Sequence, residues 1–141
     1  MFDRYSEKSR RCVFFARYEA SNFGASRMEP EHLLLGVVRE GSDFLLTFLS
    51  GEAGLTSLRA GVEAAIPRKP RTSEAIDMPI SGSLARVFRD AAKAAGRGGE
   101  VRIEHLLAGL LRQTSTAAAR VLVAHGITLE KLALNGRNPR G

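Results

Sequence analysis

The residues best suited to chemistry are two adjacent carboxylate and imidazole pairs, Glu31-His32 and Glu104-His105. Histidine and carboxylate side chains are the groups that general acid–base catalysis uses most often. However, the sequence shows no acidic or nucleophilic partner for either ring, so His32 and His105 are predicted to be packed or capping histidines. Glu31 and Glu104 remain as candidate ligand contacts.

Each pair opens a nine-residue segment that occurs twice, as EHLLLGVVR from position 31 and as EHLLAGLLR from position 104, so the copies start 73 positions apart. The similarity continues on both sides. Tyr5-Ser6 corresponds to Ile80-Ser81 at an offset of 75, and Gly54 corresponds to Gly126 at an offset of 72. The changes in offset fall in predicted turns, which is where a structural repeat tolerates them. One unit is therefore predicted to occur twice.

Apolar residues recur at three and four positions through most of the chain, which predicts amphipathic helices. Gly24 is predicted to end the first helix, Pro30 to open the second and Gly54 to separate the third from the fourth. Gly36 lies in the second helix, at a position where a bulky side chain is not expected to fit. The predicted helices span residues 6–23, 30–40, 55–66, 82–95, 103–112, 116–125 and 128–134, with a further helix that carries Phe44, Leu45, Phe48 and Leu49.

No alternation of period two lasts more than a few residues, so these elements predict an all-α fold. It consists of two tandem four-helix repeats, eight helices in all, packed with pseudo-twofold symmetry. A single repeat of about 65 residues buries too little apolar surface to be secure, and packing two repeats together supplies the missing burial. The first repeat is predicted at residues 1–66, a linker at 67–79, the second repeat at 80–134 and a flexible tail at 135–141.

The composition is that of a globular domain, with 141 residues, 44% of them hydrophobic and 26% charged. No run approaches the roughly 18 apolar residues of a membrane span, and no apolar run near the start reaches the about 7 residues that a secretory signal needs. The single cysteine, Cys12, is predicted to be a buried, inert thiol, which fits a reducing, cytoplasmic location. Three histidines and one cysteine without zinc-ligand spacing predict no metal and no cofactor.

The formal net charge of +6 raises the alternative of a basic nucleic-acid-binding helical protein. Much of the positive charge lies in residues 68–71 and 137–140, and no aromatic residue is interleaved with these cations, as stacking of bases requires. Solvated loop charge is therefore the preferred interpretation, and nucleic acid is not the expected partner. A third hypothesis, a hydrolase that uses Cys12 or a histidine, rests only on isolated residues.

Several motifs together resemble one protein family. They are the start MFDRYS, the two EHLLxG helices, the Pro79-Ile80-Ser81 opening of the second copy, and Leu122 with GITL at 126–129. In this order and at these distances they are similar to the N-terminal domain of ClpC and ClpA, which are Clp-type AAA+ unfoldases. The resemblance covers about residues 1–134.

The resemblance implies a double four-helix repeat that is not an enzyme. Such a domain docks proteins for an unfoldase that works with ClpP. The expected partners are Clp adaptor or substrate proteins and a Clp ATPase or ClpP particle, without a membrane. The phosphate-binding motif GxxxxGK[ST] does not occur in the sequence. The chain is therefore expected to be either a free-standing relative, similar to the ClpT accessory proteins of plastids, or a domain of a longer unfoldase.

The resemblance also implies a ligand. In ClpC-like domains, glutamates at the positions of Glu31 and Glu104 are similar to receptors for phosphorylated arginine, where the carboxylate takes the guanidinium in a two-pronged hydrogen bond. Ser6 and Ser81 match threonines of the family. The alternative is structural, because carboxylates are stabilised at helix N-termini by about 0.3 to 1 kcal/mol and serines are ordinary N-caps.

The residues before the two glutamates differ from the Gly-Thr of the family. Glu29 precedes the first site and is expected to repel a phosphate there. Arg102 precedes the second glutamate and is predicted to favour an anion at a site that combines Glu104 with Ser81, unless Arg102 pairs with Glu104 and blocks it. Phosphoarginine is therefore expected at the second site rather than at the first.

Phe2, Tyr5 and Ile80 begin the two copies of the repeat. They are predicted either to line an apolar, partner-binding groove at the junction of the repeats or to be buried in the core. The sequence leaves both interpretations open.

Overall fold

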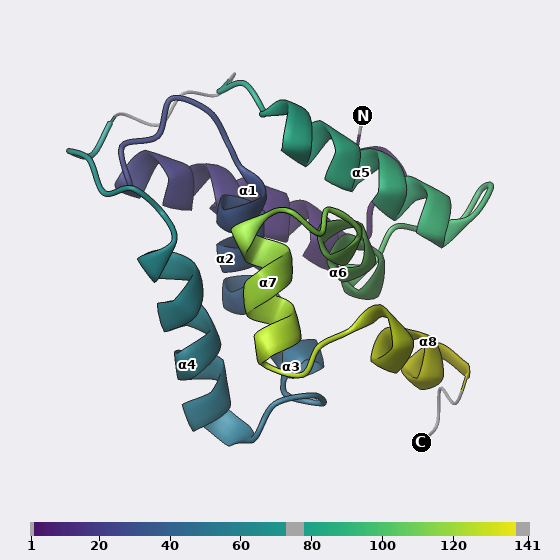
Figure 1. The fold of residues 1–141 in the computed structure, drawn as a ribbon. Helices are drawn as coiled ribbons and strands as arrows, with labels where there is room; N and C mark the ends of the chain where they lie inside the picture. Colours follow the sequence, from purple (N-terminus) through teal and green to yellow (C-terminus); the bar gives the residue numbers. More distant parts are fainter. Residues whose placement is uncertain (1, 73–77, 138–141) are drawn as a thin grey trace.

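The computed structural model describes residues 2–72 and 78–137. Within these ranges the chain forms eight helices and two isolated bridges, which confirms the predicted all-α fold (Figure 1). The helices are α1 (Glu7–Asn22), α2 (Pro30–Glu40), α3 (Ser42–Leu45), α4 (Gly51–Ala64), α5 (Gly82–Ala95), α6 (Ile103–Arg112), α7 (Ala117–Ala124) and α8 (Leu129–Arg137).

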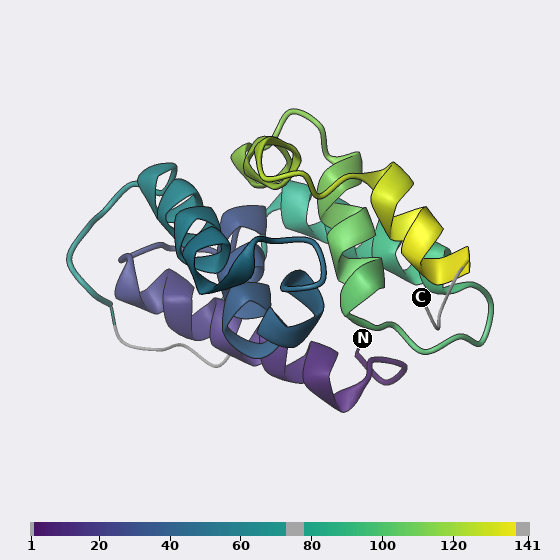
Figure 2. The same ribbon diagram turned by 90° about the horizontal axis from the view of Figure 1, so that it is seen from below.

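The two repeats lie side by side, with α1 to α4 on one side of the molecule and α5 to α8 on the other (Figure 2). Within each repeat the main contact joins the first two helices, α1 with α2 and α5 with α6. Between the repeats, α2 contacts α6 and α7, and α4 contacts α7. The core therefore continues from one repeat into the other.

The segment that opens each repeat pairs with a loop of the other repeat, so the two opening segments cross. Tyr5, just before α1, pairs with Val101 in the loop before α6, and Ile80, before α5, pairs with Met28 in the loop before α2. The two bridges are equivalent, because Tyr5 corresponds to Ile80 and Met28 to Val101 in the repeat. The backbone hydrogen bonds are Ser6 N to Val101 O (2.9 Å), Val101 N to Arg4 O (2.8 Å), Ser81 N to Met28 O (2.9 Å) and Met28 N to Pro79 O (2.9 Å).

Gly36 in α2 and Gly109 in α6 allow two helices to approach backbone to backbone. A Cβ atom at Gly36 would collide with the Cys12 carbonyl oxygen of α1, and one at Gly109 would collide with the Val87 carbonyl oxygen of α5. The expectation that a larger side chain does not fit at Gly36 is confirmed. The same close approach of two helix backbones therefore occurs in the second repeat, between α5 and α6.

The leucines of the repeated segment form the centre of the core. Leu33, Leu34 and Leu35 of α2 and Leu106 and Leu107 of α6 are 0% exposed. Full burial of one such side chain stabilises a fold by about 1.5 to 3 kcal/mol. The segment with the carboxylate and imidazole pairs is therefore mainly a packing element.

The boundary between the third and fourth helices differs from the prediction. α4 begins at Gly51, so Gly54 lies inside the helix and does not separate two helices. Gly51 adopts a φ of 66°, the left-handed conformation that glycine enters without steric cost. A glycine within a helix costs about 1 kcal/mol, less than the burial of Leu58 and Val62 on α4 returns.

The predicted linker and tail fall partly outside the described residues, at 73–77 and 138–141. α8 continues to Arg137, so the first three residues of the predicted tail are helical. In the linker, Lys69 N donates to Phe23 O (3.1 Å) and Thr72 N donates to Ser21 O (3.1 Å). Residues 67–72 therefore follow the end of α1.

Candidate functional site

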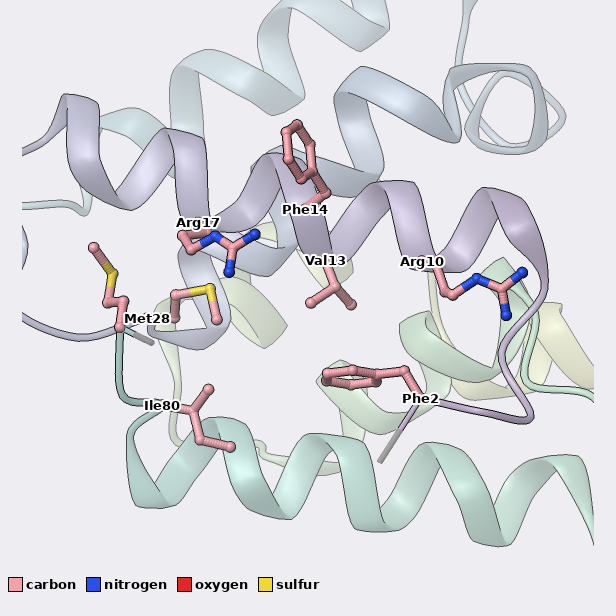
Figure 3. Close-up of a pocket in the computed structure, with 8 residues that line it drawn as sticks. Phe2, Arg10, Val13, Phe14, Arg17, Met28 and Ile80 are labelled. Atoms are coloured by element: carbon pink, nitrogen blue, oxygen red, sulfur yellow. The ribbon is translucent and has the colours of Figure 1, made fainter. Parts of the chain in front are cut away.

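An apolar groove lies between α1 and the start of α5, with a volume of about 450 Å³. In Figure 3, Val13 points from α1 toward Phe2, and Ile80 rises from the start of α5 toward the same space. We call this site the junction groove, because residues from the beginnings of both repeats meet there. Its lining residues are Phe2, Arg10, Val13, Phe14, Arg17, Met28, Met78 and Ile80.

The three residues predicted to line a groove or to be buried take different places. Phe2 and Ile80 line the junction groove, whereas Tyr5 is only 6% exposed and belongs to the core. The Tyr5 ring packs edge-on against Phe2, with 4.9 Å between centroids, and Phe88 packs against Phe2 at 5.3 Å. Burial raises the pKa of Tyr5 to about 12. Tyr5 therefore packs against Phe2, which lines the groove, and does not line the groove itself.

The contribution of α1 to the junction groove was missed from the sequence. The signal was Phe14, which falls outside the apolar stripe of α1 and is 51% exposed. Two cations also line the groove: Arg10 Nη1 donates to the Tyr5 carbonyl oxygen (2.9 Å), and the Arg17 guanidinium lies 5.8 Å from the centroid of the Phe14 ring. The groove is therefore apolar with positive charge along α1.

A second, polar pocket of about 510 Å³ lies between the start of α1 and the start of α6. We call it the Glu104 pocket. It combines residues of both repeats, because the segment before α1 crosses to the loop before α6. The lining residues are Ser6, Lys8, Asp43, Phe44, Glu100, Arg102, Ile103 and Glu104.

The pairing of serines with glutamates differs from the sequence-based prediction, because the opening segment of each repeat lies against the other repeat. The sequence grouped Ser81 with Glu104, but Ser6 is the serine that shares a pocket with Glu104. Ser81 N instead donates to Met28 O, two residues before α2. Both serines are also N-caps: Ser6 Oγ accepts from Ser9 N (3.0 Å) and Ser81 Oγ accepts from Leu84 N (3.1 Å).

Glu31 and Glu104 occupy equivalent positions but different environments. Glu31 Oε2 accepts a hydrogen bond from Ala118 N (3.0 Å) at the start of α7. The Glu104 side chain forms no hydrogen bond or ion pair with any residue in the described ranges. Arg102 does not block Glu104, because its Nε pairs with Glu100 Oε1 (3.2 Å). Glu31 therefore contacts the start of α7, whereas no described residue pairs with the Glu104 carboxylate.

Charge in the Glu104 pocket is mixed. The carboxylates are those of Asp43, Glu100 and Glu104, and the cations are Lys8 and Arg102. A ligand with a cationic part beside Glu104 and an anionic part beside Lys8 and Arg102 would be stabilised at both ends.

The two histidines of the repeated pairs are capping residues, as predicted. His32 Nδ1 accepts from Glu29 N (2.9 Å), and His105 Nδ1 accepts from Arg102 N (2.9 Å). Burial lowers the pKa of His32 to about 4 and also lowers the pKa of His105. Neither ring is therefore positioned or tuned as a catalytic base near pH 7.

Cys12 is the buried, inert thiol that the sequence predicted. It is 0% exposed, and burial is the main cause that raises its pKa to about 12. A thiol of this kind is not a nucleophile at neutral pH. Cys12 is therefore not suited to be the nucleophile that the hydrolase hypothesis requires.

His125 connects the two repeats. Its Nε2 lies 2.9 Å from the Ser57 hydroxyl of α4, and its Nδ1 lies 2.9 Å from the Val121 carbonyl oxygen of α7. Because a carbonyl only accepts, Nδ1 carries the proton and Nε2 accepts from Ser57. A hydroxyl bonded to an imidazole resembles a nucleophile and its base, but here a backbone carbonyl occupies the orienting position, and the contact joins α4 to α7.

Two arginines of the basic linker lie close to aromatic rings from elsewhere in the chain. The Arg68 guanidinium lies 4.7 Å from the centroid of Phe23, and that of Arg71 lies 5.8 Å from the centroid of Tyr18. Both rings lie in or next to α1, far earlier in the sequence, so the sequence around the linker does not reveal these contacts. These guanidinium groups stack on rings of their own chain.

Among residues 2–72 and 78–137, no group of three or more His, Cys, Asp and Glu side chains is arranged to hold a metal ion. In the same ranges, no helix has the length and apolar character needed to cross a membrane.

The chain is similar to several proteins over nearly all of its length. It is 33% identical to the Bacillus subtilis protein named "Negative regulator of genetic competence ClpC/MecB", across 100% of this chain and 18% of that protein. It is 31% identical to "Chaperone protein ClpB" of Oceanobacillus iheyensis, across 93% of this chain and 16% of that protein. The chain therefore spans less than a fifth of the length of these curated relatives.

Solved structures show the same fold. The N-terminal domain of the caseinolytic protease associated chaperone ClpD from Arabidopsis thaliana has a TM-score of 0.71 at 24% identity, with 100% of both chains covered. The Hsp104 N-terminal domain from Candida albicans has a TM-score of 0.73 at 16% identity, with 99% of this chain and 93% of that chain covered.

A family model described as the Clp repeat (R) N-terminal domain matches residues 4–125 of this chain. This range includes both copies of the repeated segment, the crossed bridges and most of the residues that line the junction groove and the Glu104 pocket. By sequence and by fold, the chain belongs to the Clp repeat N-terminal domain family.

Proposed function

We propose that this domain is a non-enzymatic binding module of the Clp system, which holds segments of substrate or adaptor proteins for a Clp ATPase or ClpP particle in the cytoplasm. The observation that carries the proposal is the junction groove. Membership of the Clp repeat family supports the Clp system as its setting, and the buried thiol of Cys12 with neutral, capping His32 and His105 supports a role without catalysis.

The junction groove suits an apolar polypeptide segment. Its volume of about 450 Å³ falls in the range of roughly 300 to 1,000 Å³ that is typical of ligand sites. Phe2, Phe14 and Ile80 offer apolar contacts, and exposed apolar surface of this kind marks interaction sites. Arg10 and Arg17 favour a segment with acidic residues beside its apolar ones.

The test is the binding of a fluorescently labelled, permanently unfolded polypeptide to the domain, followed by anisotropy. Phe14→Ser should weaken binding about tenfold or more, since a large apolar contact is worth about 1.5 to 3 kcal/mol. Val123→Ser is the matched control, because Val123 is 54% exposed on α7 and does not line the groove. Equal affinity of the parent and Phe14→Ser proteins would contradict the proposal.

We further propose that the Glu104 pocket receives phosphorylated arginine. The available Glu104 carboxylate takes the guanidinium, and Lys8 and Arg102 contact the phosphate. The Ser6 hydroxyl is already bonded to Ser9 and adds little. The equivalent site at Glu31 is assigned a structural role, because Glu31 holds the start of α7.

Free phosphoarginine should therefore raise the melting temperature of the parent protein, and Glu104→Gln should remove this rise. Glu31→Gln is the control: it should lower the melting temperature itself, because the hydrogen bond to Ala118 N is weakened, but it should keep the rise on adding ligand. If the parent protein shows no rise, the phosphoarginine proposal fails, and the proposal for the junction groove is unaffected.

A further inference from the structure

A row of cations follows the exposed side of α5, which runs along the outside of the second repeat (Figure 1). Arg86, Arg89 and Lys93 are exposed and are spaced by three and four residues, so they lie on one face of the helix. We call this row the α5 cationic face. It shares no residue with the junction groove or the Glu104 pocket. It is therefore a separate surface.

In the first repeat, the arginine that corresponds to Arg86 is paired with two carboxylates. This arginine is Arg11 of α1, at the offset of 75 that relates the first helices of the two repeats. Arg11 Nη1 lies 3.0 Å from Glu7 Oε1, and Arg11 Nε lies 2.9 Å from Glu40 Oε1. The charge of Arg11 is thus balanced within its own repeat.

The second repeat has the cation but lacks both carboxylates. The residues at the two corresponding positions are neutral, Gly82 and Gln113. Arg86 Nη2 donates to the Ser83 hydroxyl (3.3 Å), and Arg86 forms no ion pair with any residue that the structure describes. The charge of Arg86 is therefore not balanced in the described part of the chain.

A second ion pair of the first repeat is changed in the same way. Arg39 near the end of α2 pairs with the buried Glu19 of α1 (3.3 Å). The corresponding residues of the second repeat are Arg112 and Ala94. Arg112 is exposed, and its side chain forms no hydrogen bond or ion pair with any described residue. In both cases the second repeat has the arginine without its carboxylate.

Arg112 enlarges the α5 cationic face. The end of α6 lies beside α5, because Gln113 Nε2 donates to Asp90 Oδ2 (2.7 Å), and Arg112 is the last residue of α6. Asp90 is the one carboxylate of α5, and its Oδ1 lies 3.8 Å from Arg89 Nε. Four cations and one carboxylate give this surface a net charge of +3. The cations on it are Arg86, Arg89, Lys93 and Arg112.

The row favours an anionic partner. Like charges four residues apart on a helix repel each other, so Arg89 and Lys93 destabilise α5 in the free protein. Three of the four cations are arginines, whose planar guanidinium forms two parallel hydrogen bonds with a carboxylate. A partner that brings carboxylates to this face therefore removes the repulsion and gains directed hydrogen bonds.

The composition and length of the face favour an acidic polypeptide over nucleic acid. Surfaces that bind single strands carry aromatic rings among their cations, and the exposed positions of α5 hold no aromatic residue. Arg86 and Lys93 are seven residues apart, which corresponds to about 10 Å along a helix. An extended chain covers this length in about three residues. A short acidic segment therefore reaches the whole row.

We propose that the α5 cationic face docks an extended, acidic segment of a polypeptide. Carboxylates on alternate residues of the segment point to one side and pair with Arg86, Arg89 and Lys93. Arg112 pairs with a further carboxylate at the edge of the face.

The first test uses a fluorescently labelled peptide of alternating glutamate and glycine, with glutamine in place of glutamate as the control. The glutamate peptide should bind at low salt and lose at least tenfold in affinity at about 200 mM salt, because salt screens exposed charges. In ¹H–¹⁵N spectra it should shift the backbone amides of residues 86–93. No binding, equal binding of both peptides, or shifts that leave α5 unaffected would overturn the proposal.

Paired variants test the cations themselves. Arg89→Gln/Lys93→Gln should weaken peptide binding about fivefold or more, since each exposed ion pair contributes up to about fivefold in affinity. Its melting temperature should stay equal or rise, because a repulsive pair is removed. Arg27→Gln/Lys69→Gln removes the same charge from exposed positions of the first repeat and should leave binding unchanged. An equal loss in both double variants would mean unspecific attraction and would overturn the proposal.

A further variant restores part of the arrangement of the first repeat. Gly82→Glu places a carboxylate four residues before Arg86, as Glu7 precedes Arg11. A Cβ atom at Gly82 comes no closer than 3.8 Å to Arg86 Nη1, so the position has room for a side chain. Gly82→Glu should weaken peptide binding at least twofold, whereas Gly82→Gln should not. Equal affinities of these two variants would contradict the contact with Arg86 and overturn the proposal.

An oligothymidine with the same number of negative charges tests the competing class of partner. At equal salt it should bind no tighter than the glutamate peptide, because the face offers no ring for base stacking. Tighter binding of the oligonucleotide that Arg89→Gln/Lys93→Gln abolishes would overturn the proposal in favour of nucleic acid. These results are independent of the junction groove and of the Glu104 pocket, which contain none of the substituted residues.

Discussion

At the residue scale, the repeated histidines show how position in the fold changes the role of a side chain. Both are helix caps, but His32 is enclosed and His105 is partly exposed. Burial lowers the pKa of His32 from 6.5 to about 4. Unfolding therefore takes up a proton between these two pH values.

This uptake predicts a dependence of stability on pH. The group is a base whose pKa is lower in the folded state, so its contribution is complete above about pH 6.5 and is lost as the pH falls toward 4. The free energy of unfolding should fall by about 3 kcal/mol over this window. Urea unfolding at a series of pH values measures the loss. In His32→Gln, which keeps a capping side chain, the loss should be clearly smaller; an unchanged pH profile would exclude His32 as its source.

The two glutamates of the repeated pairs also lie in different environments. The sequence identified Glu31 and Glu104 as equivalent and left a ligand role and a helix-end role open for both. The structure gives the two side chains different surroundings, because the start of α7 reaches Glu31 while Glu104 lines a pocket. Local sequence could not show this, since Ala118 is far from Glu31 along the chain.

At the element scale, the contact between α1 and α2 depends on Gly36. Gly36→Ala should destabilise the protein by about 1 to 3 kcal/mol, because the new Cβ atom meets the Cys12 carbonyl oxygen and forces two backbones apart. Chemical denaturation measures the change. Gly82→Ala at the start of α5 is the control: its new Cβ atom comes no closer than 3.8 Å to Arg86 Nη1, so it should be neutral or slightly stabilising. Similar losses in both variants would contradict the close-approach explanation.

Helices were predictable because their signals are local. Apolar periodicity, Pro30 at the start of α2 and Gly24 after α1 are all contained within a few residues, and α2, α5 and α6 have the predicted bounds. The exception was the start of α4. The helix begins at Gly51, which has a positive φ, and not after Gly54 as predicted. Periodicity does not distinguish a glycine that ends a helix from one that a helix accommodates.

At the scale of the whole molecule, the crossed bridges make the binding sites. Each repeat contributes its opening segment to the other, so the junction groove and the Glu104 pocket both contain residues of both repeats. The sequence predicted the symmetry but not the crossing, because Tyr5 and Val101 pair through backbone atoms that leave no side-chain pattern. The sequence therefore named candidate residues but could not show which of them share a pocket.

The net charge of +6 comes from cations that in many cases contact other groups of the same chain. Arg4 donates to the carbonyl oxygens of Gly96 and Gly99, and Arg68 lies over Phe23. Other arginines are paired with carboxylates: Arg11 with Glu7 and Glu40, and Arg39 and Arg59 with Glu19. Much of the positive charge is thus engaged within the chain and does not form one continuous track for a phosphate backbone.

Binding of single-stranded nucleic acid should therefore be no tighter than the non-specific range of about 10⁻⁴ to 10⁻⁶ M, because few cations are arranged to contact successive phosphates. A labelled oligonucleotide titrated at about 50 and about 200 mM salt measures both affinity and slope. Since each phosphate contact contributes about 0.7 to the slope of log K against log salt on single strands, a shallow slope indicates one or two scattered contacts. Submicromolar binding with a steep slope would instead favour the nucleic-acid alternative.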